Sequence, residues 1–236
     1  MTTPQAARTA AIMQPTYLPY LGYFELIAAS EVFIFLDDVQ FARRSWQSRN
    51  RILLSGQEQM LTIPVRGHDR DTALDSIHIA DDQPWRAKHL QSLRHAYAGR
   101  PGAAEGLAFM EEQLARPADR LSQFTAGLIE AAASRLGLAP RFVRASDLGC
   151  GETRSRHLLA LCRAMNVEQY ISPRGSEGYM TQEGVFEAEG FPVRFMDFVP
   201  QPYEQGSPEF TPYMGFIDAV MNLGWAGTAD LVRRPG

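Results

Sequence analysis

The stretch that decides the fold is residues 12–50, IMQPTYLPYLGYFELIAASEVFIFLDDVQFARRSWQSRN. It continues an apolar segment, residues 10–13, which is typical of a short strand and ends at Pro15, since proline lacks a backbone donor and has a fixed φ. Apolar residues at roughly helical spacing follow in residues 21–27, and residues 32–36 are all apolar, as in a strand buried on both faces of a parallel sheet. Strand, helix and strand within about 30 residues predict one βαβ unit.

The second half of the chain repeats this alternation. Its apolar runs predict strands at residues 142–144, 170–172 and 193–198. Helical spacing predicts helices at residues 85–97, 121–136, 154–165, 181–189 and 212–223. The sequence therefore predicts an α/β fold with a mainly parallel sheet flanked by helices.

The middle of the chain departs from this pattern. Residues 51–54 and 60–65 predict two strands of a hairpin joined by a polar turn, and residues 77–79 a further short strand. The charged run RGHDRDT that follows the hairpin predicts a mobile loop. We expect a single α/β domain over residues 1–236, with a helical and irregular insertion at residues 66–120 that acts as a lid.

The composition excludes several classes of protein. With 23 Lys and Arg against 27 Asp and Glu, the formal net charge is −4, which offers no general attraction for nucleic acid. The first residues lack the apolar core of a signal peptide, and no later run approaches the roughly 18 apolar residues of a membrane span. We expect a soluble, cytoplasmic protein with no nucleic-acid and no membrane partner; the sequence leaves the oligomeric state open.

The cysteines and histidines do not indicate a metal centre. Cys150 and Cys162 form no CxxC pair, so they are expected to be reduced thiols. The five histidines show no HxxxH or HExxH spacing. Among them only His68, in the charged loop, is placed to reach a site from a lid.

Polar residues follow the first two predicted strands at the point where each strand ends. Gln14 follows the first strand, and Asp37 and Asp38 follow the second. Ligands of open α/β sheets bind beyond the carboxyl ends of the strands, so these side chains are expected at a crevice. We interpret Gln14 and Asp38 as catalytic, with Asp38 as a general base, a holder of a substrate hydroxyl or amine, or a Mg²⁺ ligand. Alternation favours only one aspartate in the crevice; Asp37 either binds substrate or caps the next turn.

Tyr17 and Tyr20 frame the turn after the first strand. Their phenols can bind a base, a sugar or a carboxylate, and the helix that follows directs its positive amino end at an anion. We assign both to substrate binding. The alternative is a packed corner, because amphipathic aromatic side chains often pack against one another.

A polar cluster follows Asp38 and gives further candidates for substrate binding. Guanidinium groups match the hydrogen-bond geometry of phosphate or carboxylate, and the tryptophan ring offers a flat surface for stacking. Arg49 and Asn50 are favoured because they directly precede an apolar strand that holds them. The alternative is a solvated charged loop. The residues of the cluster are Gln40, Arg43, Arg44, Trp46, Arg49 and Asn50.

A second turn has the same position relative to a strand and a helix. Arg174, Gly175 and Ser176 follow the predicted strand at residues 170–172, with Tyr179 nearby. Backbone donors and the Ser176 hydroxyl in such a turn are able to hold an anion. We assign these four residues to substrate binding at the same crevice, although a Gly-Ser turn is also a common structural feature.

These motifs together resemble the WbqC-like protein family. The resemblance is carried, in order, by QPTYLPYLGYFELI, FLDDVQF, RRSWQSRNRI, YISPRGSEGYM and YMGFIDAVMNLG. Genes of this bacterial family often neighbour genes for O-antigen, lipopolysaccharide or other surface polysaccharides. The resemblance implies a cytoplasmic enzyme of activated-sugar or related secondary metabolism.

The chain also resembles, more distantly, pantothenate synthetase and the nucleotidylyltransferase superfamily. Pro15-Thr16 matches the turn after the first strand in those enzymes, and Val39-Gln40-Phe41 matches the polar stretch after the second. This resemblance implies a Rossmann-like, nucleotidylyltransferase-like fold. The paired histidines that bind nucleotide phosphates in that superfamily are replaced here by tyrosines.

Two classes of function follow from these residues. The first is a group transferase or ligase that acts on a nucleotide-activated sugar or an amino-acid-like substrate with an anionic group, using a nucleotide with or without Mg²⁺. The second is a non-catalytic binding or scaffold protein of a polysaccharide biosynthesis system. A metal-dependent hydrolase is a third possibility, and it requires convergent carboxylates and histidines.

Overall fold

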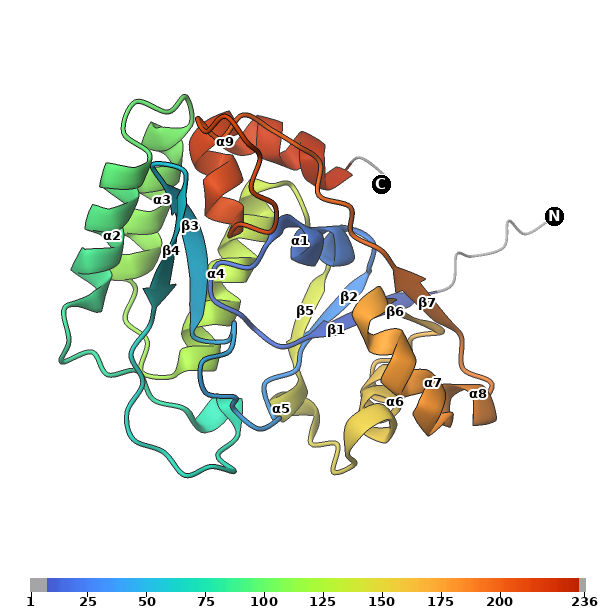
Figure 1. Ribbon diagram of the computed structural model, residues 1–236. Helices are drawn as coiled ribbons and strands as arrows, with labels where there is room; N and C mark the ends of the chain where they lie inside the picture. Colours follow the sequence, from blue (N-terminus) through green and yellow to red (C-terminus); the bar gives the residue numbers. More distant parts are fainter. Residues whose placement is uncertain (1–7, 234–236) are drawn as a thin grey trace.

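A five-stranded parallel sheet forms the centre of the computed structural model, which describes residues 8–233 (Figure 1). The strand order is β5-β2-β1-β6-β7, and every pair of neighbours is parallel. The fold is therefore the α/β, Rossmann-like fold that the alternation of strands and helices predicts. The strands are β1 (Thr9–Met13), β2 (Val32–Phe35), β5 (Arg141–Arg144), β6 (Gln169–Pro173) and β7 (Val193–Met196).

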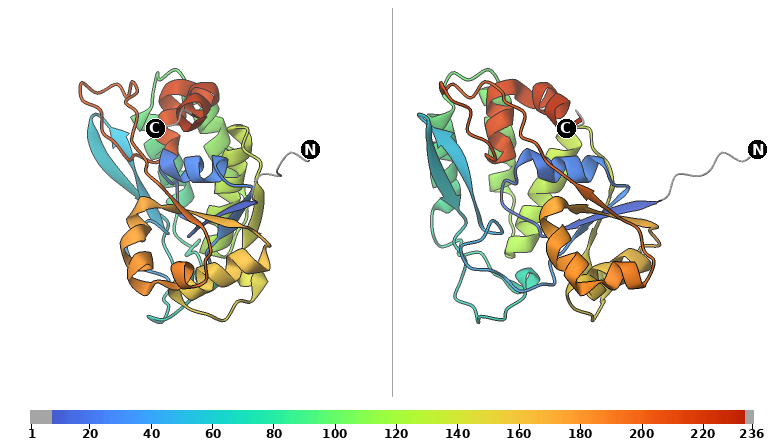
Figure 2. Two further views of the ribbon diagram at one scale, coloured as in Figure 1. Left: turned by 90° about the vertical axis from the view of Figure 1, so that its right-hand side faces the viewer. Right: turned by 45° about the vertical axis from the view of Figure 1, so that its right-hand side comes forward.

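Alternate strand residues enter two separate cores, one on each face of the sheet. Ala11 and Phe33 contribute to the core that includes α1 (Leu21–Ala28), α4 (Leu121–Arg135) and α9 (Phe216–Arg233). Ala10 and Ile34 contribute to the opposite core, with α6 (Arg154–Ala164), α7 (Glu177–Glu183) and α8 (Val185–Ala188). Figure 2 shows these two groups of helices on either side of the sheet. Burial on both faces explains why the strands are continuous apolar runs.

An antiparallel hairpin, β3 (Arg49–Leu54) and β4 (Gln57–Thr62), lies beside the main sheet and does not pair with it. Its second strand begins three residues earlier than the sequence predicts. The cause is a two-residue turn in which Ser55 and Gly56 both have positive φ, 51° and 77°, as tight hairpins require.

The segment of residues 66–120 contains a loop and two helices, α2 (Trp85–Ala96) and α3 (Ala103–Ala115). The loop includes a 3-10 turn, η1 (Leu74–Ser76). The strand predicted at residues 77–79 is absent from the described elements, where His78 and Ile79 form only isolated bridges. Buried side chains of α2 and α3 belong to the same core as α1 and α9.

Two helices differ from their predicted bounds, and in each a glycine with positive φ lies at the point of difference. The helix predicted at residues 181–189 is divided into α7 and α8 by Gly184, with φ of 61°. The helix predicted to end at residue 223 continues as α9 to Arg233, with a kink at Gly224, where φ is 70°. No helix among residues 8–233 has the length and apolar character to cross a membrane.

The connection between β7 and α9 is held by a buried carboxylate. Asp218 of α9 accepts hydrogen bonds from the hydroxyls of Tyr97 at 2.7 Å and Tyr203 at 2.6 Å, and from Gln205 Nε2 at 2.9 Å. Tyr203 and Gln205 belong to the connection itself, so Asp218 fixes this long segment to the core.

Candidate functional site

The crevice expected in a sheet of this topology lies where the strand order reverses, between β1 and β6. Gln14 follows β1, Asp37 and Asp38 follow β2, and Arg174 follows β6. The carboxyl ends of these parallel strands meet at one edge of the sheet, so four of the sequence candidates come from neighbouring strand ends.

Asp38 is held by a histidine that the sequence did not single out. The Nε2 atom of His157 lies 3.1 Å from Asp38 Oδ1 and 3.0 Å from Oδ2. His157 is a buried residue of α6, and its Nδ1 atom is also buried and has no hydrogen-bond partner within residues 8–233. The imidazole therefore orients the carboxylate from the side of the protein.

The two aspartates have different environments. The side chain of Asp38 is 20% exposed, whereas that of Asp37 is 2% exposed. Asp37 accepts hydrogen bonds from the backbone N–H and the hydroxyl of Ser146, both at 3.0 Å, at the start of the short helix α5 (Ala145–Leu148). Burial raises the pKa of Asp37, and the bonds from Ser146 and the charge of Arg144 oppose that rise. Asp37 thus stabilises the turn after β5, and Asp38 is the carboxylate in contact with solvent.

Gln14 is oriented by a second glutamine. Gln47 is buried, and its Nε2 donates to Gln14 Oε1 at 2.9 Å. The Oε1 atom of Gln47 accepts from the backbone N–H of Ala42 at 2.9 Å and from the Ser45 hydroxyl at 3.0 Å. With its oxygen occupied, Gln14 has its Nε2 group available as a donor; it makes no hydrogen bond in the described part of the chain.

Tyr17 lies in the core and does not face the crevice. It is completely buried, its ring stacks on His89, and its hydroxyl is 2.9 Å from His89 Nδ1. Burial lowers the pKa of His89 to about 4, so this imidazole is neutral at pH 7. Tyr17 is therefore part of a packed aromatic corner, which was the alternative to substrate binding for this residue.

Asn50 also has a structural position. Its Nδ2 donates to the carbonyl oxygens of Tyr17 at 3.1 Å and Leu18 at 2.7 Å, and its side chain is buried. Leu18 has φ of 46°, which is unfavourable for a leucine, so Asn50 stabilises a strained turn. Both amide hydrogens of Asn50 are used in these bonds, and its role in substrate binding stays a prediction.

A pocket of about 380 Å³ lies next to the end of β1 and is called here the aromatic pocket. Trp46 is 49% exposed at this pocket, and the Arg51 guanidinium lies 5.7 Å from its ring centre. Tyr20 is half-buried and also lines it. The complete lining is Met13, Thr16, Pro19, Tyr20, Tyr23, Trp46, Asn50, Arg51 and Tyr213. Flat rings around a concave space suit a nucleobase or a sugar ring.

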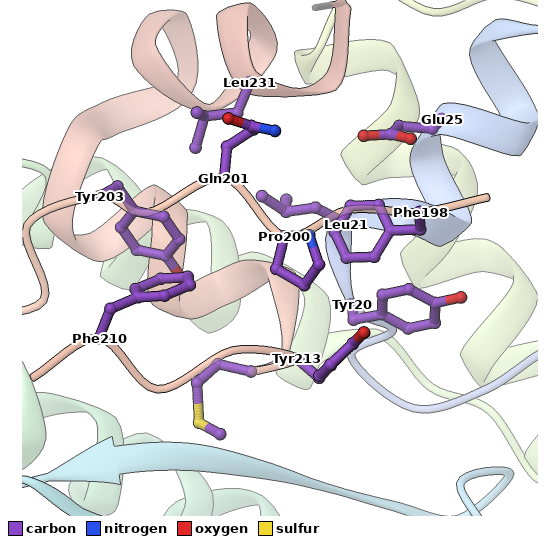
Figure 3. Close-up of a pocket in the computed structure, with 11 residues that line it drawn as sticks. Tyr20, Leu21, Glu25, Phe198, Pro200, Gln201, Tyr203, Phe210, Tyr213 and Leu231 are labelled. Atoms are coloured by element: carbon purple, nitrogen blue, oxygen red, sulfur yellow. The ribbon is translucent and has the colours of Figure 1, made fainter. Parts of the chain in front are cut away.

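Tyr20 and Tyr213 separate this pocket from a smaller cavity of about 20 Å³ (Figure 3). Figure 3 shows Tyr20, Tyr213 and Phe198 close together, with the carboxyl group of Glu25 above the Phe198 ring in this view. The ring centres of Tyr20 and Phe198 are 5.1 Å apart. Burial raises the pKa of Glu25 from 4.5 to about 7. A cavity of this size holds about one water molecule, so it is not a substrate site.

The arginines of the polar cluster line a different pocket from the one that Trp46 lines. Arg43, Arg44 and Arg49 line a cavity of about 330 Å³ that shares no lining residue with the aromatic pocket. Gln40 is exposed, and its Nε2 donates to Arg70 O at 2.9 Å, so it holds the loop of residues 66–72. The structure therefore divides the predicted cluster between two pockets.

The turn after β6 offers no free charge. Arg174 pairs with Asp197 at 3.0 Å and with Glu177 at 3.1 Å, and both partners neutralise its guanidinium. Gly175 and Ser176 lie in a 3-10 turn, η2 (Arg174–Ser176), and Tyr179 is exposed on α7. The role of Arg174, Gly175, Ser176 and Tyr179 in substrate binding stays a prediction. No group of three or more His, Cys, Asp or Glu side chains in residues 8–233 is arranged to hold a metal ion.

Comparison with known proteins agrees with the sequence motifs. The model of the WbqC-like protein family matches residues 14–230. The chain is 29% identical over 232 residues to an uncharacterized protein of Mycobacterium tuberculosis, Rv1507c, covering 96% of this chain and 98% of that protein. No solved structure matches the chain. The family model includes every candidate residue of the crevice, and the chain belongs to the WbqC-like protein family.

Proposed function

We propose that this protein is an enzyme, a group transferase or ligase that acts on a nucleotide-activated sugar or an amino-acid-like substrate. The observation that carries the proposal is the Asp38–His157 pair at the carboxyl edge of the sheet. A partly exposed carboxylate that is oriented by a buried imidazole is suited to accept a proton from a substrate hydroxyl or amine.

The surrounding residues have complementary roles in this proposal. Gln14 donates from its free Nε2 to the substrate, in an orientation set by Gln47. Trp46 and Tyr20 stack on a planar or sugar group in the aromatic pocket. Arg44 and Arg49 bind an anionic group, and a nucleotide, with or without Mg²⁺, is the proposed cofactor. Since tyrosines replace the phosphate-binding histidines of nucleotidylyltransferases, phosphate binding is assigned to the arginines.

The family supports the proposed biological setting. Surface-polysaccharide biosynthesis in the cytoplasm, with O-antigen as one product class, is what membership of the WbqC-like family favours. A single domain and a lid formed by residues 66–120 remain predictions. A lid would close from the loop of residues 66–72, since α2 and α3 are packed into the core.

A thermal-shift screen against nucleotides, nucleotide sugars and amino acids tests the proposal, because a ligand that binds the native state raises its melting temperature.

Turnover of the ligand that gives the largest shift is then measured with Asp38→Asn. We expect a loss of about 100-fold or more, the usual contribution of a general base. Asp230→Asn, an exposed aspartate of α9, is the matched control and is expected to retain activity. Equal turnover by Asp38→Asn and the wild type contradicts the role of Asp38. Stabilisation by none of these ligands favours the non-catalytic scaffold.

A further inference from the structure

We propose that the pocket lined by Arg43, Arg44, Arg49 and Arg66, called here the arginine pocket, is a binding site for the diphosphate group of a ligand. The pocket measures about 330 Å³ and lies between the loop of residues 41–49 and the segment of residues 62–68. His68 and Ser48 also line it.

The arginine pocket has an excess of positive charge. No Asp or Glu of residues 8–233 lines the pocket, and none of its four arginines forms an ion pair with a carboxylate in that part of the chain. Elsewhere arginines are commonly paired, as Arg163 is with Glu189. A multiply charged anion in this concavity would be attracted by several guanidiniums at once and would meet no carboxylate of the described lining.

Arg49, which lines the arginine pocket, has a buried hydrogen-bond donor that is not used. The Nε atom of Arg49 is buried and has no hydrogen-bond acceptor within the described residues. A buried donor without a partner destabilises the folded state, and such groups are uncommon in native proteins. An anion in the pocket would supply an acceptor next to this guanidinium.

The loop of residues 41–49 is held in shape by its own hydrogen bonds, without a ligand. Gln47 fixes the loop through Ala42 and Ser45, as described above, and the Arg43 Nη2 atom donates to His68 O at 3.3 Å. Arg44 has φ of 58°, a conformation that arginine rarely adopts. A strained residue in a fixed loop is a feature of ligand-binding segments.

The number of donors favours a phosphate chain over a single carboxylate. One carboxylate pairs with one or two guanidiniums and leaves the others unpaired, whereas a diphosphate presents several oxygens and more than one charge. Nucleic acid is disfavoured by the net charge of −4 and by the confined pocket. Gln47 belongs to this loop and donates to Gln14, so the arginine pocket and a proposed catalytic residue are connected through one loop. The assignment to a diphosphate rests on the proposed function, which gives phosphate binding to these arginines.

Calorimetric titration with pyrophosphate, at constant ionic strength, tests the site. We expect binding to the wild type, and a dissociation constant raised about tenfold or more by Arg49→Gln and by Arg44→Gln. Arg194→Gln, an exposed residue of β7, removes the same charge at a distance and is expected to leave the affinity unchanged. Arg44 is exposed, so its variant keeps the test valid if Arg49→Gln fails to fold.

Several results would overturn the proposal: no binding of pyrophosphate to the wild type, equal weakening by Arg194→Gln, or citrate binding as tightly as pyrophosphate. Tighter binding of a nucleoside diphosphate than of pyrophosphate would support the site and identify the phosphate as part of a nucleotide. Pyrophosphate titration measures the arginines without turnover, and the turnover of Asp38→Asn measures the general base with the arginines intact. The anion site and the proposed general base can therefore fail separately.

Discussion

At the scale of single residues, environment decides which of two neighbouring identical side chains is available for chemistry. Asp37 and Asp38 are adjacent, yet one is enclosed by Ser146 and the other contacts His157 and solvent. The sequence predicted that one aspartate faces the crevice, because side chains alternate along a strand. It did not predict His157, which is 119 positions from Asp38 and has no motif around it. Only the packing of α6 beside the end of β2 brings the pair together.

His157 is expected to act as a positioning residue for Asp38. In His157→Asn the carboxylate loses its fixed orientation, so turnover should fall while substrate affinity changes little, and the pH profile of turnover should shift. Steady-state kinetics against pH measure both effects. His95→Asn, an exposed histidine of α2, is the control. An unchanged pH profile in His157→Asn would show that the histidine only fills space.

Glu25 gives a prediction about pH and stability. Burial raises its pKa from 4.5 to about 7, so within this window the folded protein binds more protons than the unfolded chain. The free energy of unfolding should therefore fall as pH rises from 4.5 to 7, by less than about 3 kcal/mol because the group is only half-buried. Urea denaturation at several pH values measures the slope. Glu25→Gln should remove this contribution, whereas Glu168→Gln, on the surface, should not.

At the scale of elements, two connections depend on few contacts. The β3–β4 turn requires positive φ at Gly56, so Gly56→Ala should destabilise the protein by about 1 kcal/mol. An added Cβ there would also lie 3.3 Å from Ser207 Oγ. Gly151→Ala is the control, because that glycine has no positive φ and no neighbour within 4 Å of an added Cβ. Equal melting temperatures of the two variants would contradict this account of the turn.

The connection from β7 to α9 depends on Asp218. Removing the hydroxyl in Tyr203→Phe deletes one hydrogen bond to a buried carboxylate, which should cost about 1.5 to 3 kcal/mol. Tyr179→Phe removes a hydroxyl from an exposed side chain and should cost much less. Chemical denaturation of both variants provides the comparison; similar losses would exclude a special role for the Asp218 cluster.

The sequence predicted the helices and strands better than the contacts between side chains, and the reasons are physical. The runs of residues 32–36 and 170–172 are strands because apolar residues on both faces have few other stable arrangements. Tyr17 was ambiguous, since a tyrosine serves equally well in a core and in a site. The ion pair of Arg174 with Asp197 was not predicted, because the two residues lie 23 positions apart and Asp197 follows the next strand. Such pairings become visible only when the strands are in register.

At the scale of the whole molecule, the parallel sheet places the proposed chemistry and the two proposed binding pockets around one loop. Residues 41–50 carry Trp46 toward the aromatic pocket and three arginines toward the arginine pocket. Gln47 links that loop to the end of β1. The arrangement suits an extended ligand with a planar or sugar part and a phosphate part, joined near the strand ends.

The most direct test is a crystal structure of the protein with the ligand that gives the largest thermal shift. The account predicts that this ligand lies across the carboxyl ends of β1 and β2, within hydrogen-bond distance of Asp38 and Gln14. Its phosphate should face the arginine pocket. Binding elsewhere, for example in the cavity between β4 and α2, with the strand ends empty, would contradict the central claim.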